Sequence, residues 1–196
     1  MNSVIDQCLL QETLDFCRKH QSSITKNNYI TITIGSELCD QLVLSREFPE
    51  GKAKKISKHL STFSKPIIKH SRIYKYIHSE YHVLENVEKH YTISYPHHNI
   101  STKDGLSIIS LYKNQHEEPL EQFPSRQKYH DIINRSEYIF DMEKMYQLCI
   151  VYEETSRKHT WTIEIRILHY NINESRLLSS ISDTLTTLIA LYHQTD

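Results

Sequence analysis

The sequence contains few glycines and no glycine-rich loop. Only 3 of its 196 residues are glycine, and neither GxGxxG nor GxxxxGK[ST] occurs. Loops of that kind allow backbone amides to approach phosphates closely in the common nucleotide-binding folds. The sequence therefore disfavours those folds, and any phosphate site has to be built from side chains.

The chain also lacks an excess of charge of either sign. Lysine and arginine number 23, aspartate and glutamate number 24, and the formal net charge is -1. Such a chain has no overall attraction to nucleic acid or to a membrane surface. A site for an anion must come from local clustering of basic residues.

Sequence signals for metal-binding cysteines and for membrane insertion are missing as well. The 4 cysteines show no CxxC spacing, which argues against a zinc knuckle or a redox motif. The N-terminal segment lacks the basic start and apolar run of a signal peptide, and no segment is long enough to span a bilayer. We expect an intracellular protein with reduced, buried thiols and no membrane partner.

Tyrosines and alternating runs of β-branched residues are abundant instead. The chain has 13 tyrosines, and residues of these types favour strands. We expect one α+β domain over residues 1–196. An N-terminal helix is predicted over 3–19, strands and a further helix over 27–170, and a C-terminal helix over 173–193.

Two of the predicted helices carry apolar stripes. In the helix that begins near Glu50, the stripe consists of Ala53, Ile56, Leu60 and Phe63. The C-terminal helix has a wider stripe than a single packing line needs, with Leu185, Leu188, Ile189, Leu191 and Tyr192. We favour packing of this stripe on the protein's own sheet. If the spare residues stay exposed, a homodimer or a heteromer follows.

The segment from Thr160 to Ile167 alternates strictly between polar and apolar residues. Its polar positions are Thr160, Thr162, Glu164 and Arg166. Such a strand buries one face in apolar packing and presents the other to a polar environment. About eight strands with a polar face, and helices to cover the apolar face, favour a closed antiparallel barrel with a hydrophilic interior. A sandwich whose polar faces meet solvent fits the same patterns.

Basic residues cluster in one short segment. Arg126, Lys128 and His130 alternate in "RQKYH", so that three potential cations share one face of a predicted strand. Cations stacked in this way form a reasonable site for phosphate, and an exposed solubilising strand face is the alternative.

Acidic residues follow in the next predicted strand, "EYIFDMEKM". There Ile139, Asp141 and Glu143 share one face, and Tyr138, Phe140 and Met142 share the other. An acidic strand beside a basic one would orient the cations through ion pairs.

The order of these segments resembles the triphosphate tunnel metalloenzymes, and within them the metal-dependent RNA 5′-triphosphatases of mRNA capping. The resemblance rests on "KDGLSIISLYK", "RQKYH", "YIFDMEKM" and "WTIEIRI", followed by a terminal helix. It implies an eight-stranded antiparallel tunnel with flanking helices. It also implies binding of the 5′-triphosphate end of RNA, or of a nucleoside triphosphate, and hydrolysis of the γ-phosphate with Mg²⁺ or Mn²⁺ where activity is retained.

The resemblance assigns roles to individual residues. Arg126 and Lys128 match the first two cations of the family's RxKxR strand, His130 replaces the third, and Arg166 adds a further positive charge. These residues would bind phosphate. Asp141 matches the aspartate of the family's DxT strand, and Glu164 matches one acid of its late ExE strand, which would make Glu164 a metal ligand.

Several positions depart from the family's pattern. Thr31 and Thr33 stand where paired glutamates are expected on the first strand, and Thr162 and Arg166 flank Glu164. A divalent ion of this type prefers carboxylate oxygens, so metal affinity should fall sharply. The alternative function is a catalytically degenerate tunnel subunit that serves as an interaction module in a capping or transcription complex. A β-sandwich adaptor remains a third option.

Overall fold

The computed structural model describes part of the chain. The described residues are 15, 18–19, 30–37, 44–45, 47–76, 81–85, 90–94, 106–113, 115–119, 129–142, 146–167 and 174–194. Most of the helix predicted over 3–19 lies outside these residues, although Asp15, Arg18 and Lys19 are helical.

The described chain combines one antiparallel sheet with two helices, as the α+β prediction requires. The helices are α2 (Glu50–Ser61) and α3 (Glu174–His193). The strands are β1 (Ile30–Glu37), β2 (Leu44–Ser45), β3 (Ile67–Tyr76), β4 (Tyr81–Glu85), β5 (His90–Ser94), β6 (Leu106–Lys113), β7 (Gln115–Pro119), β8 (Tyr129–Met142), β9 (Tyr146–Glu154) and β10 (His159–Ile167). Among the described helices, none is long and apolar enough to cross a membrane.

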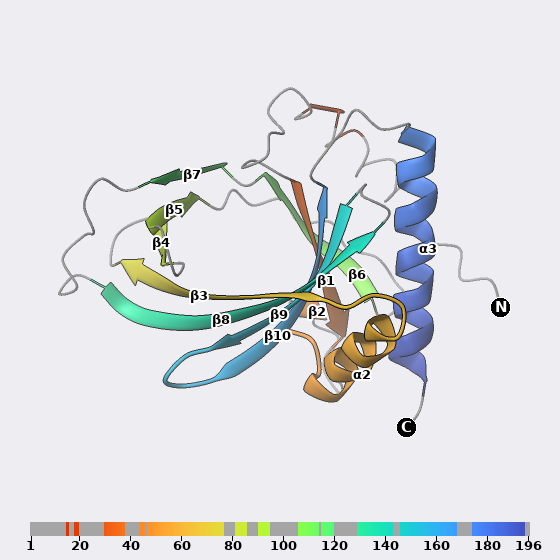
Figure 1. Ribbon diagram of the computed structural model, residues 1–196, viewed down its shortest axis with the longest axis horizontal. Coiled ribbons are helices and arrows are strands. Elements are labelled where there is room, and N and C mark those ends of the chain that lie inside the picture. Colours follow the sequence, from red (N-terminus) through yellow and green to blue (C-terminus); the bar gives the residue numbers. More distant parts are fainter. Residues whose placement is uncertain are drawn as a thin grey trace.

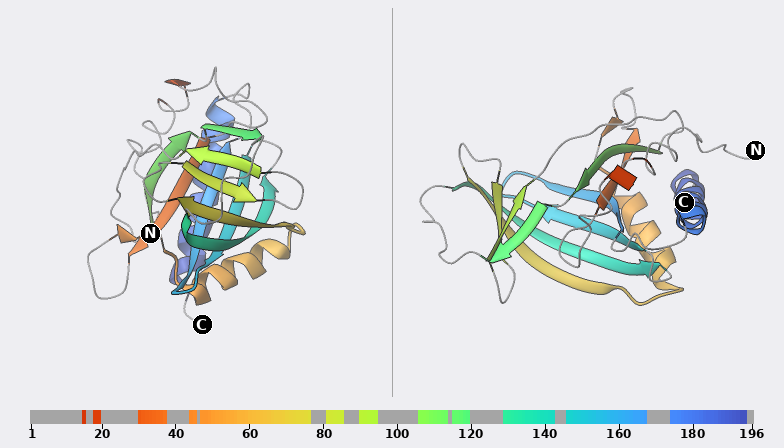
Figure 2. Two further views of the ribbon diagram at one scale, coloured as in Figure 1. Left: turned by 90° about the vertical axis from the view of Figure 1, so that its left-hand side faces the viewer. Right: turned by 90° about the horizontal axis from the view of Figure 1, so that it is seen from above.

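The strand order is β2-β1-β10-β9-β8-β3-β4-β5-β7, and β6 pairs with β1. The sheet is strongly curved, with α2 and α3 on one side and β4, β5 and β7 curving away from the helices (Figure 1). Two further views show the same arrangement, with α3 lying against the sheet (Figure 2).

One face of the sheet packs against both helices. Alternation in β1 and β10 places isoleucines on this face, and Ile30, Ile32, Ile163 and Ile165 are each 0% exposed. Burial of about 25 cal/mol per Å² of apolar surface makes this layer the main source of stability. The predicted alternation of β10 is therefore confirmed, and β1 alternates in the same way.

Helix α2 is shorter than its apolar pattern suggests. Ala53 and Ile56 are buried and Leu60 packs against the core, as predicted. The helix ends at Ser61, however, and Phe63 is 78% exposed. The prediction that Phe63 extends the buried stripe is wrong, because the chain has left the helical path before this residue.

Helix α3 confirms the predicted C-terminal helix to within a residue at its start. Leu177, Ile181, Leu185 and Leu188 are buried against the sheet. The wider part of the stripe is also used within the protein. Ile189 and Tyr192 pack against the same core, and the Tyr192 ring lies 5.5 Å from that of Phe48. This apolar stripe therefore packs on the protein's own sheet.

Tyr146 fixes α3 to β9 through its hydroxyl group. The hydroxyl lies 2.5 Å from Thr184 Oγ1 and donates to the backbone oxygen of Ser180 at 3.0 Å. We expect Tyr146→Phe to lower the free energy of unfolding by about 1 to 2 kcal/mol, because it leaves buried acceptors without this donor. Urea denaturation of the two proteins measures the difference. An unchanged midpoint would show that water replaces the hydroxyl at no cost.

Candidate functional site

The face of the sheet that points away from the helices carries an ion-pair network, which we call the polar face. It is built from β8, β9 and β10. Strand β9 lies between the other two, and its short side chains Cys149 and Val151 lie at the register positions of Glu164 and Glu137. Long side chains from β8 and β10 can therefore meet across β9.

Arg166 of β10 binds two carboxylates. Its Nη2 donates to Glu137 Oε1 at 2.6 Å and to Glu164 Oε2 at 2.8 Å. Its Nε also donates to Glu164 Oε2, at 3.2 Å. A single guanidinium thus connects a carboxylate from β8 with a carboxylate from its own strand.

Arg135 of β8 completes the network from the other side. It donates to Glu137 Oε1 at 2.9 Å and to Glu153 Oε1 at 2.8 Å. A longer contact of 3.5 Å reaches Glu164 Oε2. Two arginines therefore share three carboxylates, so these five side chains carry one more negative than positive charge.

The network is largely shielded from solvent. Glu164 and Arg166 are 6% and 5% exposed, and the threonines of β1 that pair with them, Thr33 and Thr31, are 4% and 1% exposed. A sandwich whose polar strand faces meet bulk water does not account for this burial. Thr31 Oγ1 is buried and has no hydrogen-bond partner among the described residues.

The pKa of Glu137 reflects this setting. Burial raises its pKa, but the charges of Arg166 and Arg135 and their hydrogen bonds outweigh burial and hold the pKa well below its ordinary value of 4.5. Folding therefore favours the carboxylate form. The stabilisation from this ionised carboxylate is fully present above pH 4.5, the ordinary pKa of the group. It is lost as the pH falls from 4.5 toward the lower pKa that Glu137 has in the folded protein.

This linkage gives a pH-dependent prediction. Between about pH 5 and about pH 3 we expect the wild-type protein to lose stability more steeply than Glu137→Gln, which has no carboxylate to titrate. Urea unfolding at a series of pH values measures both slopes. Parallel slopes in the two proteins would mean that Glu137 is not ion-paired in the folded state.

Cys149 lies beneath the network and is not a nucleophile in this state. It is buried with Ile139 and Val151 in a small apolar cluster. Burial raises the pKa of the Cys149 thiol to about 12. The thiol stays protonated at neutral pH, and the expectation of a reduced, buried thiol is confirmed for this cysteine.

The structure places some of the predicted site residues together and leaves others apart. Glu164 and Arg166 lie in the network and bind each other. Asp141 lies on the same strand as Arg135 but is exposed, and its Oδ1 accepts a hydrogen bond from Gln147 Nε2 at 2.8 Å. His130 belongs to β8, while Arg126, Lys128 and the His130 side chain lie outside the described residues.

The prediction of two separate strands, one at "RQKYH" and the next at "EYIFDMEK", is wrong. Tyr129–Met142 form one continuous strand, β8. An acidic strand therefore does not lie beside a basic one. His130 and Asp141 are eleven positions apart on β8, roughly 35 Å at the rise of an extended strand, so Asp141 does not orient a cation at His130 through a neighbouring strand.

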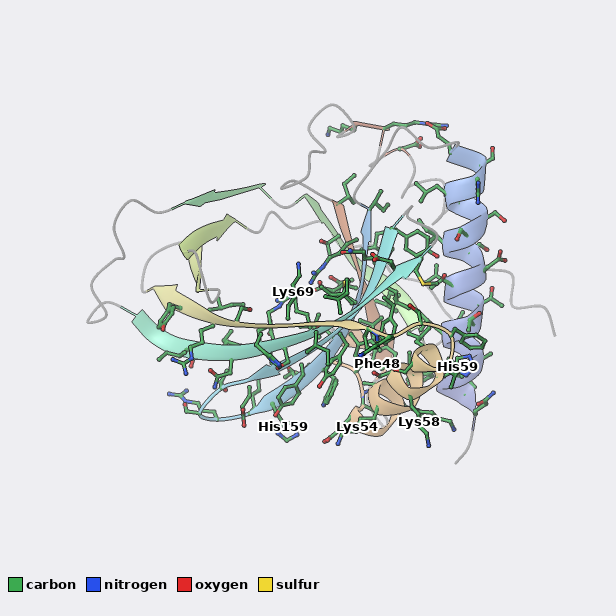
Figure 3. All side chains as sticks on the ribbon, viewed as in Figure 1. Phe48, Lys54, Lys58, His59, Lys69 and His159 are labelled. Atoms are coloured by element: carbon green, nitrogen blue, oxygen red, sulfur yellow. The ribbon has the colours of Figure 1, made fainter. Side chains whose placement is uncertain are left out.

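Three functional candidates were missed by the sequence reasoning: Arg135, Glu137 and Lys69. Extending the alternation of Ile139 and Asp141 backward along β8 would have placed Arg135 and Glu137 on the same face. Lys69 is the register partner of Glu137 on β3 and is exposed. Its side chain lies on the side of the sheet away from Lys54 and Lys58 of α2 (Figure 3).

The described donor set of the polar face does not fit a divalent metal. Carboxylate oxygens of Glu137 and Glu164 are within hydrogen-bond distance of Arg166, and a guanidinium this close repels a second cation. Within the described residues, no group of three or more histidine, cysteine, aspartate or glutamate side chains is placed to hold a metal ion.

The curved antiparallel sheet, with helices on one face and charged residues on the other, is similar in fold to several solved structures. An RNA triphosphatase is among them. The S. pombe Pct1 RNA triphosphatase, solved in complex with the Spt5 CTD, matches with a TM-score of 0.60 at 8% identity, covering 97% of this chain and 90% of that one.

A second similar structure comes from a virus. The Mimivirus capping enzyme triphosphatase matches in its monoclinic form with a TM-score of 0.64 at 9% identity, covering 95% of this chain and 100% of that one. Its triclinic form gives a TM-score of 0.61 at 10% identity, over 94% of this chain and 98% of that one. No protein-family model and no curated protein matches the chain. At these identities the similarity concerns the fold.

Proposed function

We propose that this chain is an RNA 5′-triphosphatase-like tunnel protein of mRNA capping, and that its polar face binds the triphosphate end of RNA. The observation that carries the proposal is the buried polar face itself. Arginines there lie within a sheet whose fold matches the RNA triphosphatases. This function requires an intracellular location, nuclear or cytoplasmic.

The proposal includes closure of the sheet into an eight-stranded tunnel. Strand β6 pairs with β1 at one end of the strand order, and β7 pairs with β5 at the other. Only Asn114 separates β6 from β7 in the sequence. If this segment acts as one strand, it joins both ends of the sheet and encloses the polar face, which agrees with the burial of Thr31 and Thr33.

Phosphate contacts are proposed for two sets of residues. Arg126, Lys128 and His130 retain the role that the resemblance gives them. Lys69 joins them as a cation on the polar face with no ion-pair partner among the described residues. An ammonium that is not committed to a carboxylate can bind a phosphate without first breaking an ion pair.

Hydrolysis is a separate question from binding. The resemblance implies a divalent metal held by Glu164, with Asp141 assisting catalysis, but the arginines bound to Glu164 oppose a metal there. We therefore expect tight binding of triphosphate-ended RNA with little or no Mn²⁺-dependent release of the γ-phosphate.

Phosphate release and RNA binding can be measured side by side. Wild type and Lys128→Ala are incubated with triphosphate-ended RNA, with and without Mn²⁺, and binding is followed by fluorescence anisotropy. Binding that weakens in Lys128→Ala supports the proposal. Mn²⁺-dependent release by wild type would assign hydrolysis to the chain and restore the metal role of Glu164. Absence of RNA binding would exclude both forms of the function.

A second candidate function is that of an interaction module in a capping or transcription complex. A specific observation favours it: Phe63, Ile67 and Ile68 are 78%, 51% and 52% exposed and follow one another closely after α2. Ile67 and Ile68 are consecutive residues of β3 and point to opposite faces of the sheet, so we take Phe63 and Ile68 as the candidate protein contacts. If this candidate is correct, Phe63→Ser together with Ile68→Ser removes a co-purifying partner and leaves RNA binding unchanged.

A further inference from the structure

Arg166 occupies an unusual position between two acidic side chains. Its Nη2 contacts Glu137 Oε1 at 2.6 Å and Glu164 Oε2 at 2.8 Å. Both carboxylates are therefore bridged by one nitrogen, as a small cation would bridge them. Side-chain exposures of 6%, 14% and 7% for Arg166, Glu137 and Glu164 show that water screens this contact only weakly.

The position of Arg166 in the sheet explains why it bridges these acids. Strand β10 carries Glu164 and Arg166 on the same face, two residues apart, so the guanidinium can fold back to Glu164. Glu137 approaches from β8 across β9, where Val151 is its register partner. The backbone thus brings one cation and two anions together without any long loop.

We propose that the Arg166 guanidinium is a built-in substitute for a divalent cation, and that it conceals a latent metal site formed by Glu137 and Glu164. The guanidinium carries a permanent positive charge because its pKa lies above any physiological pH. Together with Arg135, which contacts the same two acids, it offsets their negative charges without depending on metal supply. We therefore expect the polar face to fold in the same way with and without divalent metal.

Carboxylate chemistry makes the latent site specific for a hard divalent ion. Glutamate oxygens are ligands that Mn²⁺ and Mg²⁺ prefer. Among the described residues, Arg135 is the second cation that contacts both Glu137 and Glu164, so loss of Arg166 would remove one of the two cations that the structure places on this pair of carboxylates. Glu153, which Arg135 contacts at 2.8 Å, adds a third carboxylate to the same region. A divalent cation would relieve the repulsion that the lost guanidinium leaves behind.

The test measures melting temperature as Mn²⁺ is titrated, because a ligand of the folded state raises the melting temperature by mass action. Wild type and Arg166→Lys, which keeps the positive charge, should show no Mn²⁺-dependent shift. Arg166→Gln and Arg166→Met should melt at a lower temperature than wild type and regain several degrees in millimolar Mn²⁺. If either of these two variants is unfolded without metal, addition of Mn²⁺ should restore the circular dichroism spectrum of a folded protein.

A double variant identifies the ligand. Adding Glu164→Gln to Arg166→Gln should abolish the Mn²⁺ response, whereas adding the exposed Glu154→Gln should leave it intact. The proposal is overturned if neither Arg166 variant gains a Mn²⁺-dependent rise in stability or folding, or if wild type already responds as strongly. Because the readout is metal binding, this result does not depend on whether the protein binds RNA.

Discussion

Replacing Arg135 with alanine is expected to lower the free energy of unfolding by about 3 to 5 kcal/mol, the range observed when one partner of a buried ion pair is removed. Arg135 is 12% exposed and contacts Glu137, Glu153 and Glu164. Its loss would leave three carboxylates with Arg166 as their principal cation. Repulsion among the three carboxylates, together with the cavity left by the missing side chain, lowers the free energy of unfolding.

A matched arginine controls for the general effect of this substitution. Arg157 lies exposed in the turn between β9 and β10, and Arg157→Ala should change stability by no more than about 0.5 kcal/mol. Guanidinium chloride would screen the ion pairs under study, so urea is the appropriate denaturant. Equal effects of the two substitutions would show that the network contributes no net stability.

Lys69→Ala is expected to weaken binding of triphosphate-ended RNA by roughly 10- to 100-fold, the range for one hydrogen bond to a charged group. Lys69 is exposed and is the register partner of Glu137. No carboxylate in the described part of the chain is ion-paired with Lys69, so its ammonium group can bind phosphate without first breaking an ion pair there. Folding stability should barely change, because an exposed lysine contributes little to packing.

The control for Lys69 is a lysine on the opposite side of the sheet. Lys58 is exposed on α2, and its substitution removes the same charge from the protein. If the polar face is the binding surface, Lys58→Ala retains close to wild-type affinity at the same ionic strength. Similar losses in both variants would indicate non-specific attraction between RNA and any surface lysine.

Much of the sheet could be predicted from local patterns. In β10 the strict alternation of isoleucines with polar residues identified both faces correctly, because side chains on a strand point alternately to opposite sides. The stripe of α3 was equally informative, since Leu177 and Ile181 recur at helical spacing and are buried. These features depend only on the sequence of a single element.

Features that depend on contacts between elements were harder to predict. The end of α2 at Ser61 was missed because the spacing of Phe63 continues the helical stripe, although the chain there turns toward β3. Strand β8 was divided in two because its "NRS" segment resembles a turn; in the sheet, pairing with both β3 and β9 keeps Arg135 extended.

The network itself could be anticipated only in part. Glu164 and Arg166 were placed on one face from the sequence, but nothing local to β10 indicates that Glu137 lies within reach of Arg166. That contact depends on strand order and register across β9. As a result, the sequence predicted a phosphate-binding role for Arg166, whereas the structure shows it bound to two carboxylates.

Recognition of the 5′-triphosphate by the polar face can be tested with two RNAs that differ only at the 5′ end. Calorimetric titration at one fixed salt concentration, with triphosphate-ended and monophosphate-ended forms of the same oligonucleotide, isolates the contribution of the two outer phosphates. We predict at least about tenfold tighter binding of the triphosphate form. Equal affinities for the two RNAs would show that the polar face does not recognise a triphosphate.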